Sequence, residues 1–132
     1  MTKALVIKTS GEVEQITLPD EKAFLEIQKH VGGVFDFVSM GENNIGAYVN
    51  DEGLLVGLEP NPLLCLMFGR MLVGDAVLVG LGDGDGNDGD VPAHYLTDDF
   101  KAFGREMGKD ETLRANLVQW RDEMDITPKL IF

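Results

Sequence analysis

The feature that most restricts the fold is a carboxylate-rich stretch with no compensating basic residue. Residues 75–99 contain no Lys or Arg and hold seven acidic side chains, namely Asp75, Asp83, Asp85, Asp88, Asp90, Asp98 and Asp99. The densest part, residues 82–90, consists only of Gly, Asp and Asn. Such a stretch buries too little apolar surface to offset the entropy of ordering it, and its charges repel one another. We therefore predict a solvated loop with a strong negative field, suited to cations or to a basic partner protein.

The net charge of the chain favours some classes of binding partner and disfavours others. The chain has 11 Lys and Arg against 23 Asp and Glu, a formal net charge of −12. Because phosphate recognition depends on basic side chains, direct binding to nucleic acid or to an anionic membrane surface is disfavoured. A protein with a basic surface is the better electrostatic match. The length of 132 residues suits one domain with a single core, spanning residues 1–132.

Cysteine content and hydropathy indicate the compartment. Cys65 is the single cysteine, which excludes an internal disulfide and fits a reducing environment. The apolar part of the N-terminus is too short for a signal peptide. The longest apolar region, near Leu63–Val73, falls below the ~20 residues that a membrane span needs. We therefore expect a cytoplasmic protein.

Apolar patterning and turn signals predict short strands mixed with helices. The expected strands are Ala4–Thr9, Val13–Leu18, Val34–Met40, Ile45–Val49, Leu54–Leu58 and Ala76–Leu81. The first two flank a Gly-containing connection typical of a β-hairpin, and residues 45–49 and 54–58 flank a second one. Strands and helices do not alternate regularly, so we predict an α+β fold. It is a mostly antiparallel sheet built from hairpins, packed by helices on one face, with C-terminal helices.

Capping residues predict where the helices begin and end. A first helix is expected after an Asp20 cap and before Gly32-Gly33, and a second, buried helix over Leu63–Leu72 after Asn61-Pro62. Residues 97–132 are expected as a helical extension, with one helix capped by Thr97 and another opening at Asp110. The last helix has an apolar stripe formed by Leu113, Leu117, Trp120 and Met124. That stripe suits packing on the sheet or on a second copy, so a homodimer stays open.

Five short segments of the sequence, taken together in their order and spacing, resemble those of a known family. They are residues 3–8 (Lys-Ala-Leu-Val-Ile-Lys), 31–33 (Val-Gly-Gly), 48–53 (Tyr-Val-Asn-Asp-Glu-Gly), 57–61 (Gly-Leu-Glu-Pro-Asn) and 73–80 (Val-Gly-Asp-Ala-Val-Leu-Val-Gly). Over residues 3–99 the chain resembles a family of small uncharacterised proteins of bacteriophages and of actinobacterial and other bacterial genomes. The resemblance implies a phage or mobile-element origin, a cytoplasmic location and an α+β domain. It brings no catalytic residues.

The Gly/Asp stretch also has a partial likeness to a calcium loop. Asp83, Asp85 and Asn87 occupy positions one, three and five of an EF-hand-like pattern, and Asp88 and Asp90 add carboxylates. Asp88 stands at position six, where the turn needs Gly, and position twelve lacks the bidentate Glu. Binding of a divalent cation such as Ca²⁺, or of a small cationic ligand, is therefore the alternative function. No other cofactor is indicated.

Isolated reactive side chains give no catalytic pattern. His94 suits an acid–base or metal pair with Asp88 or Asp90, which would allow a hydrolase, but a surface His beside acids is commoner. Cys65 lies in an apolar helix and is expected as a buried structural thiol. His30 is expected in the last turn of the first helix, where it suits the helix dipole.

The preferred hypothesis is a phage-encoded, non-catalytic protein-binding module that acts on host or phage machinery. Imitation of DNA charge and anti-defence action are sub-cases of it. This hypothesis rests on the net charge and on the lack of any catalytic motif in the sequence. The candidate partner-binding residues are Asp83, Asp85, Asp88, Asp90, His94 and Tyr95.

Overall fold

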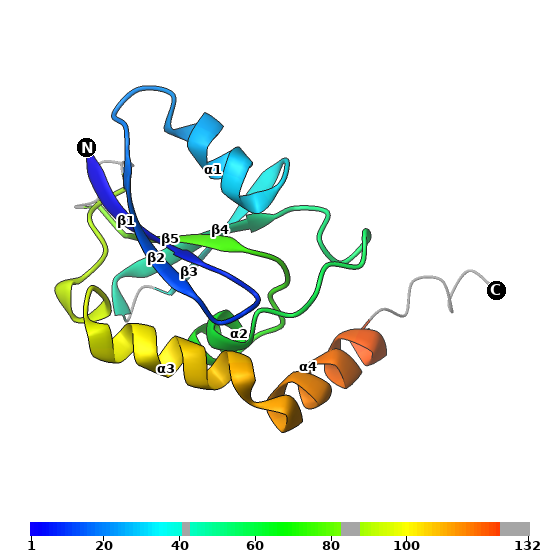
Figure 1. Ribbon diagram of the computed structural model, residues 1–132. Helices are drawn as coiled ribbons and strands as arrows, with labels where there is room; N and C mark the ends of the chain where they lie inside the picture. The colour runs from blue at the N-terminus through cyan, green and yellow to red at the C-terminus, as the bar shows by residue number, and fades with distance from the viewer. Residues whose placement is uncertain (41–42, 83–87, 125–132) are drawn as a thin grey trace.

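The structure is a computed structural model that describes residues 1–40, 43–82 and 88–124 (Figure 1). Within these ranges five strands form one sheet: β1 (Thr2–Ile7), β2 (Val13–Leu18), β3 (Phe35–Met40), β4 (Ile45–Asn50) and β5 (Ala76–Gly80). The helices are α1 (Ala23–Val31), α2 (Pro62–Phe68), the 3₁₀ helix η2 (Ala93–Tyr95), α3 (Asp98–Lys109) and α4 (Glu111–Met124). The expected α+β fold with C-terminal helices is confirmed.

The sheet has the strand order β2-β1-β5-β4-β3, and every neighbouring pair is antiparallel. The expected first hairpin, β1 with β2, is present. The second hairpin joins β3 to β4, so the expected pairing of residues 45–49 with residues 54–58 is wrong. The physical reason is that β4 already pairs with β3 on one edge and β5 on the other.

Residues 51–57 form a compact turn in place of the expected strand. Inside it the Val56 N–H donates to the Glu52 carbonyl (3.0 Å), and the Leu58 N–H donates to the Gly53 carbonyl (2.9 Å). Leu58 packs against the core, whereas the turn's other large apolar side chains are exposed. Local hydrogen bonds thus satisfy the backbone groups that a strand would have paired.

Helices cover both faces of the sheet, not one face as expected. The central strand β5 is buried along its whole length. Its Val77 and Val79 pack in the cluster that includes residues of α1, whereas Leu78 packs on the opposite side with residues of α2 and α4. A strand that is apolar at every position needs cover on both sides. The one-face expectation therefore holds for α2–α4 and fails for α1 (Figure 1).

Two expected helix boundaries are corrected. α1 begins at Ala23 rather than directly after Asp20, because Lys22 takes a left-handed conformation (φ 57°) and the Asp20 carboxylate pairs with the amino group of Met1. α2 ends at Phe68 rather than at residue 72, because Gly69 (φ 64°) turns the chain. Thr97 caps α3 as expected, with its hydroxyl oxygen accepting from the N–H of residue 100 (3.1 Å).

Asn61 is the only polar residue in the core of the described residues. Its Nδ2 donates to the carbonyls of Ile7 (2.9 Å) and Gly74 (3.0 Å), and its Oδ1 accepts from the Leu64 N–H (3.2 Å). One amide therefore joins the end of β1, the residues before β5 and the first turn of α2. Because all its groups are bonded, its burial carries no desolvation penalty for an unpaired atom.

Glycines let α3 lie directly on the turn between β1 and β2. A Cβ added at Gly104 would stand 2.6 Å from the Gly11 carbonyl oxygen, and one at Gly108 would stand 2.0 Å from the Ser10 carbonyl oxygen. Only hydrogen atoms fit in that space. Gly11 has a φ of 93°, which other residues rarely adopt.

α4 is attached by arginine side chains as well as by apolar packing. Leu117 is buried, but Trp120 and Met124 of the expected stripe are 39% and 46% exposed. Arg114 Nη1 donates to the Thr9 carbonyl (2.7 Å), and Arg121 Nη1 donates to the carbonyl of residue 58 (3.1 Å). None of the helices in residues 1–40, 43–82 and 88–124 combines the length and apolar character needed to span a bilayer.

Replacing Asn61 by Ala should lower the free energy of unfolding by about 2–4 kcal/mol, because it leaves two buried carbonyls without a donor and removes a helix cap. Asn116→Ala, at an exposed position of α4, should change it by less than about 0.5 kcal/mol. Urea unfolding measures both values. Equal effects of the two substitutions would contradict the assigned role.

Gly104→Ala should destabilise the protein, although Ala normally favours a helix interior by about 1 kcal/mol over Gly. The added Cβ would press on the carbonyl oxygen of Gly11, so the usual sign should reverse. Ala102→Gly, at an exposed position of the same helix, serves as the control and should show the ordinary loss. Thermal unfolding compares them, and a raised Tm for Gly104→Ala would disprove the close contact.

Candidate functional site

The acidic site predicted from the sequence falls partly outside the described residues. Asp83, Asp85 and Asn87 lie outside them, and Asp88 and Asp90 lie inside. In residues 1–40, 43–82 and 88–124, no group of three or more His, Cys, Asp or Glu side chains is placed to hold a metal ion. The calcium hypothesis therefore stays a sequence-based alternative.

The two described carboxylates of this site hold the chain in place. Asp88 Oδ2 accepts a hydrogen bond from the Tyr48 hydroxyl (2.5 Å), and Asp90 Oδ1 accepts one from the backbone N–H of Lys3 (2.8 Å). Each bond joins the acidic stretch to a strand distant in sequence. Charge-assisted bonds of this kind are stronger than neutral ones. Asp88 and Asp90, which the sequence analysis assigns to partner binding, therefore also stabilise the fold.

The acidic stretch is also fixed by its backbone. Gly80 and Gly89 exchange two backbone hydrogen bonds, each 2.9 Å long. A Cβ on Gly80 would stand 2.0 Å from the Asp90 carbonyl oxygen, so this crossing requires glycine. At the start of the stretch, Asp75 Oδ1 accepts from the Thr9 N–H (2.9 Å). The described residues on either side of 83–87 are therefore held next to each other by Gly80 and Gly89.

Tyr48 lies where the acidic stretch meets the α1 side of the sheet. Its ring meets Phe35 edge-on at 5.0 Å and Phe37 at 4.8 Å between ring centres. Partial burial, followed by the hydrogen bond to Asp88 and the negative charge of that carboxylate, raises the pKa of Tyr48. The hydroxyl therefore remains a donor at neutral pH.

His94 and Tyr95 do not form a catalytic arrangement with a described carboxylate. The His94 side chain is exposed, and its ring lies 4.1 Å from the ring of Tyr95, which in turn meets Phe100 edge-on at 5.1 Å. Tyr95 packs against the main core, and burial raises its pKa. Tyr95 is thus an anchor for the η2 segment, with His94 on its outer side.

Two further side chains lie where the sequence predicts them. Cys65 is 3% exposed; its thiol donates to the Leu72 carbonyl (3.2 Å) and its sulfur accepts from the N–H of the same residue (3.3 Å). Burial raises the pKa of this thiol, so it is a poor nucleophile. His30 lies in the last turn of α1, 3.9 Å from the Glu26 carboxylate.

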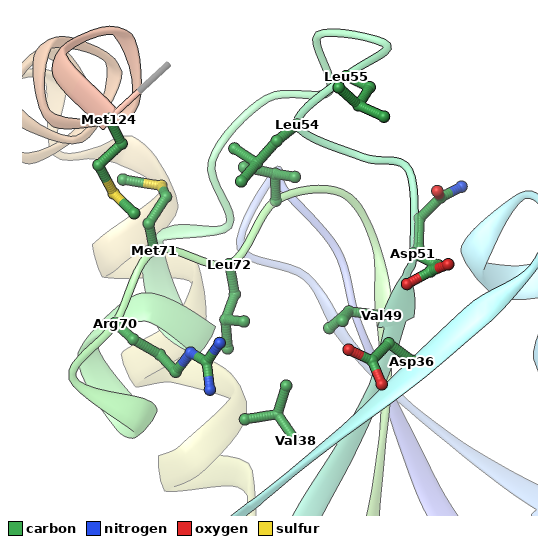
Figure 2. A pocket seen from close by; sticks show the side chains of 12 residues that line it. Asp36, Val38, Val49, Asp51, Leu54, Leu55, Arg70, Met71, Leu72 and Met124 are labelled. Carbon is green, nitrogen blue, oxygen red and sulfur yellow. The ribbon is translucent and has the colours of Figure 1, made fainter. Parts of the chain in front are cut away.

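The described residues also enclose a groove of about 350 Å³ that sequence reasoning missed (Figure 2). We call it the Leu54 groove. Its lining residues are Asp36, Val38, Val49, Asn50, Asp51, Leu54, Leu55, Arg70, Met71, Leu72, Val73 and Met124. They come from β3, β4, the turn after β4, the segment after α2 and the last described turn of α4. These segments are distant in sequence, so no local motif announces the groove.

The walls and rim of the Leu54 groove differ in chemistry. Buried aliphatic side chains, including Val49, line its inner part. Figure 2 shows Met71 and Met124 together on one side, with Leu54 across from them. The charged lining residues separate as well, since Arg70 lies on the side of Met71 whereas Asp51 lies on the opposite side (Figure 2).

Comparison with known proteins places the chain in a family. The family described as "Domain of unknown function (DUF3846)" matches residues 1–124. The chain belongs to this family. No curated protein and no solved structure matches it. The matched region of the DUF3846 domain includes α3 and α4 and thus extends beyond residues 3–99, over which the resemblance was drawn.

The pH dependence of stability tests the environment of Tyr48 in this DUF3846 domain. The pKa of Tyr48 is raised in the folded state, so the stability from its protonated hydroxyl is complete below the ordinary value of 10.0 and is lost as pH rises above it. The free energy of unfolding should therefore fall above that pH, and fall less in Tyr48→Phe. Urea unfolding between about pH 9 and about pH 11 measures both slopes. Identical slopes would refute the assignment.

Proposed function

We propose that this DUF3846 domain is a non-catalytic protein-binding module, and that the Leu54 groove holds a segment of its partner. The observation that carries the proposal is the exposure of Leu54 and Leu55, two adjacent lining residues of the groove that are 43% and 82% exposed. Contiguous apolar side chains on a folded surface are typical of sites that another molecule covers.

The chemistry of the groove suggests what the partner presents. The aliphatic interior suits apolar side chains, and burying one large aliphatic side chain contributes about 1.5–3 kcal/mol. Asp36 and Asp51 are exposed at the rim and suit a Lys or Arg beside them. The net charge of −12 adds long-range attraction for a basic partner. A host or phage protein, as the resemblance implies, is the proposed source.

The mode of binding follows from the edge strand. β3 is at the edge of the sheet, where a peptide could add as a further strand. The Phe37 N–H, however, already donates to the Asp36 carboxylate (2.8 Å), so it is not available to an added strand. Blocked edge groups protect a sheet against pairing with other chains. We therefore favour side-chain insertion into the groove over strand addition.

The make-up of the groove supports binding over catalysis. Its lining contains no Ser, Thr, Cys, His, Lys or Tyr. A hydroxyl, thiol, imidazole or amine nucleophile is therefore missing from this set of residues, whose ionisable groups are Asp36, Asp51 and Arg70. The buried Cys65 thiol lies outside the lining.

Selection from a displayed library of random peptides on the full chain tests the proposal. Enriched peptides should share apolar residues next to a Lys or Arg. Their affinity should fall about tenfold or more in Leu55→Asp, since an apolar contact is lost and a charge is introduced. The double variant Asp36→Lys, Asp51→Lys should also weaken binding, and rising salt should weaken it in the natural chain.

Val56→Asp is the matched control, because Val56 is exposed in the same turn but does not line the groove. Its affinity for the selected peptides should stay within about twofold of the natural chain. A library that yields no enriched peptide, or peptides that bind Leu55→Asp and the natural chain equally, would refute the proposed function.

A further inference from the structure

The Leu54 groove opens at the end of the described chain. Met124 is the last residue of α4, and its side chain lies beside Met71 in the lining (Figure 2). The sequence continues for eight residues, Asp125 to Phe132. Fully extended, eight residues reach about 27 Å. The segment that follows α4 is therefore tethered at the mouth of the groove and long enough to cross it.

The composition of residues 126–132 matches the interior of the groove. The segment ends on the apolar run Leu130-Ile131-Phe132, which suits a lining rich in Leu, Val and Met. Pro128 has no N–H to donate and cannot continue the hydrogen bonding of α4.

The charges of the segment match those of the rim as well. In the sequence Asp125 directly follows Met124, and Lys129 comes four residues later. Arg70 lies on the same side of the groove as Met71 and Met124 (Figure 2). The carboxylate of Asp51 lies on the opposite side (Figure 2). The segment thus carries charges of both signs, as the rim of the groove does, and such pairing favours a defined orientation of a bound segment.

We propose that residues 126–132 bind in cis in the Leu54 groove and act there as an internal competitor for the partner. This inference rests on the proposed function, since it assigns the same groove to a ligand within the chain. A tethered segment has an effective concentration on the order of millimolar. A partner must displace it, so the apparent affinity falls by the fraction of chains whose groove is open.

Methyl NMR on the full chain tests the docking. With Ile, Leu and Val methyl groups labelled, the Ile131 methyl should show nuclear Overhauser contacts with the methyl groups of Leu54 or Leu55. In Leu55→Asp the Ile131 resonance should move toward the shift of a flexible peptide, whereas in the control Val56→Asp it should not move. An Ile131 methyl at the flexible-peptide shift in the natural chain, without these contacts, overturns the proposal.

Labelling also separates docking in cis from exchange between two copies. In a mixture of copies with labelled and with unlabelled methyl groups, contacts of Ile131 should be confined to one molecule. Contacts between molecules, together with a dimer in sedimentation, would overturn the assignment in cis.

Peptide affinity distinguishes this inference from the proposed function. The triple variant Leu130→Asp, Ile131→Asp, Phe132→Asp should bind the library-selected peptides about tenfold more tightly than the natural chain, because the competitor is removed. Equal affinity would overturn the competition while the proposed function stands. Docked methyl contacts in a chain for which no peptide is selected would support the intramolecular contact and refute the proposed function.

Discussion

The buried amide of Asn61 is the interaction on which the rest of the fold depends. Its contacts reach Ile7 at the end of β1, Gly74 before β5 and Leu64 in α2, so one side chain fixes a sheet, a loop and a helix relative to each other. The surrounding core is apolar, where an unpaired polar atom is costly. An arrangement that moved these three segments apart would break the hydrogen bonds of that amide, which selects against misregistered packing.

Local signals predicted the parts of the fold that are settled within a few residues. The β1–β2 hairpin, the Asn61 and Thr97 caps and the stop at Gly32 are as expected, because each depends on neighbours in sequence. Residues 54–58 have strand-like composition, yet they are excluded from the sheet because β4 is paired on both edges. Competition between distant segments decides this outcome, and a single sequence does not contain it.

In the candidate site, too, the features set by neighbouring residues could be predicted, whereas those set by distant segments could not. The acidic stretch was visible in the sequence, but the use of Asp88 and Asp90 as hydrogen-bond acceptors for Tyr48 and Lys3 depends on strands far away in the chain. The Leu54 groove was not visible, because residues from 36 to 124 contribute to it. The sequence predicts a strand at the exposed turn that borders this groove, and in a strand alternate side chains would be buried.

The Gly80–Gly89 closure has a consequence for how such chains diverge. The register of β5 is set by its pairing with β1 and β4, and this pairing does not depend on the residues between Gly80 and Gly89. Each doubling of a loop's length costs only about 0.6 kcal/mol. Residues can therefore be inserted or deleted between 82 and 88 with little effect on the sheet. This stretch is thus a position at which evolution, or an engineer grafting a foreign epitope, can change the length of the chain at small cost to the sheet.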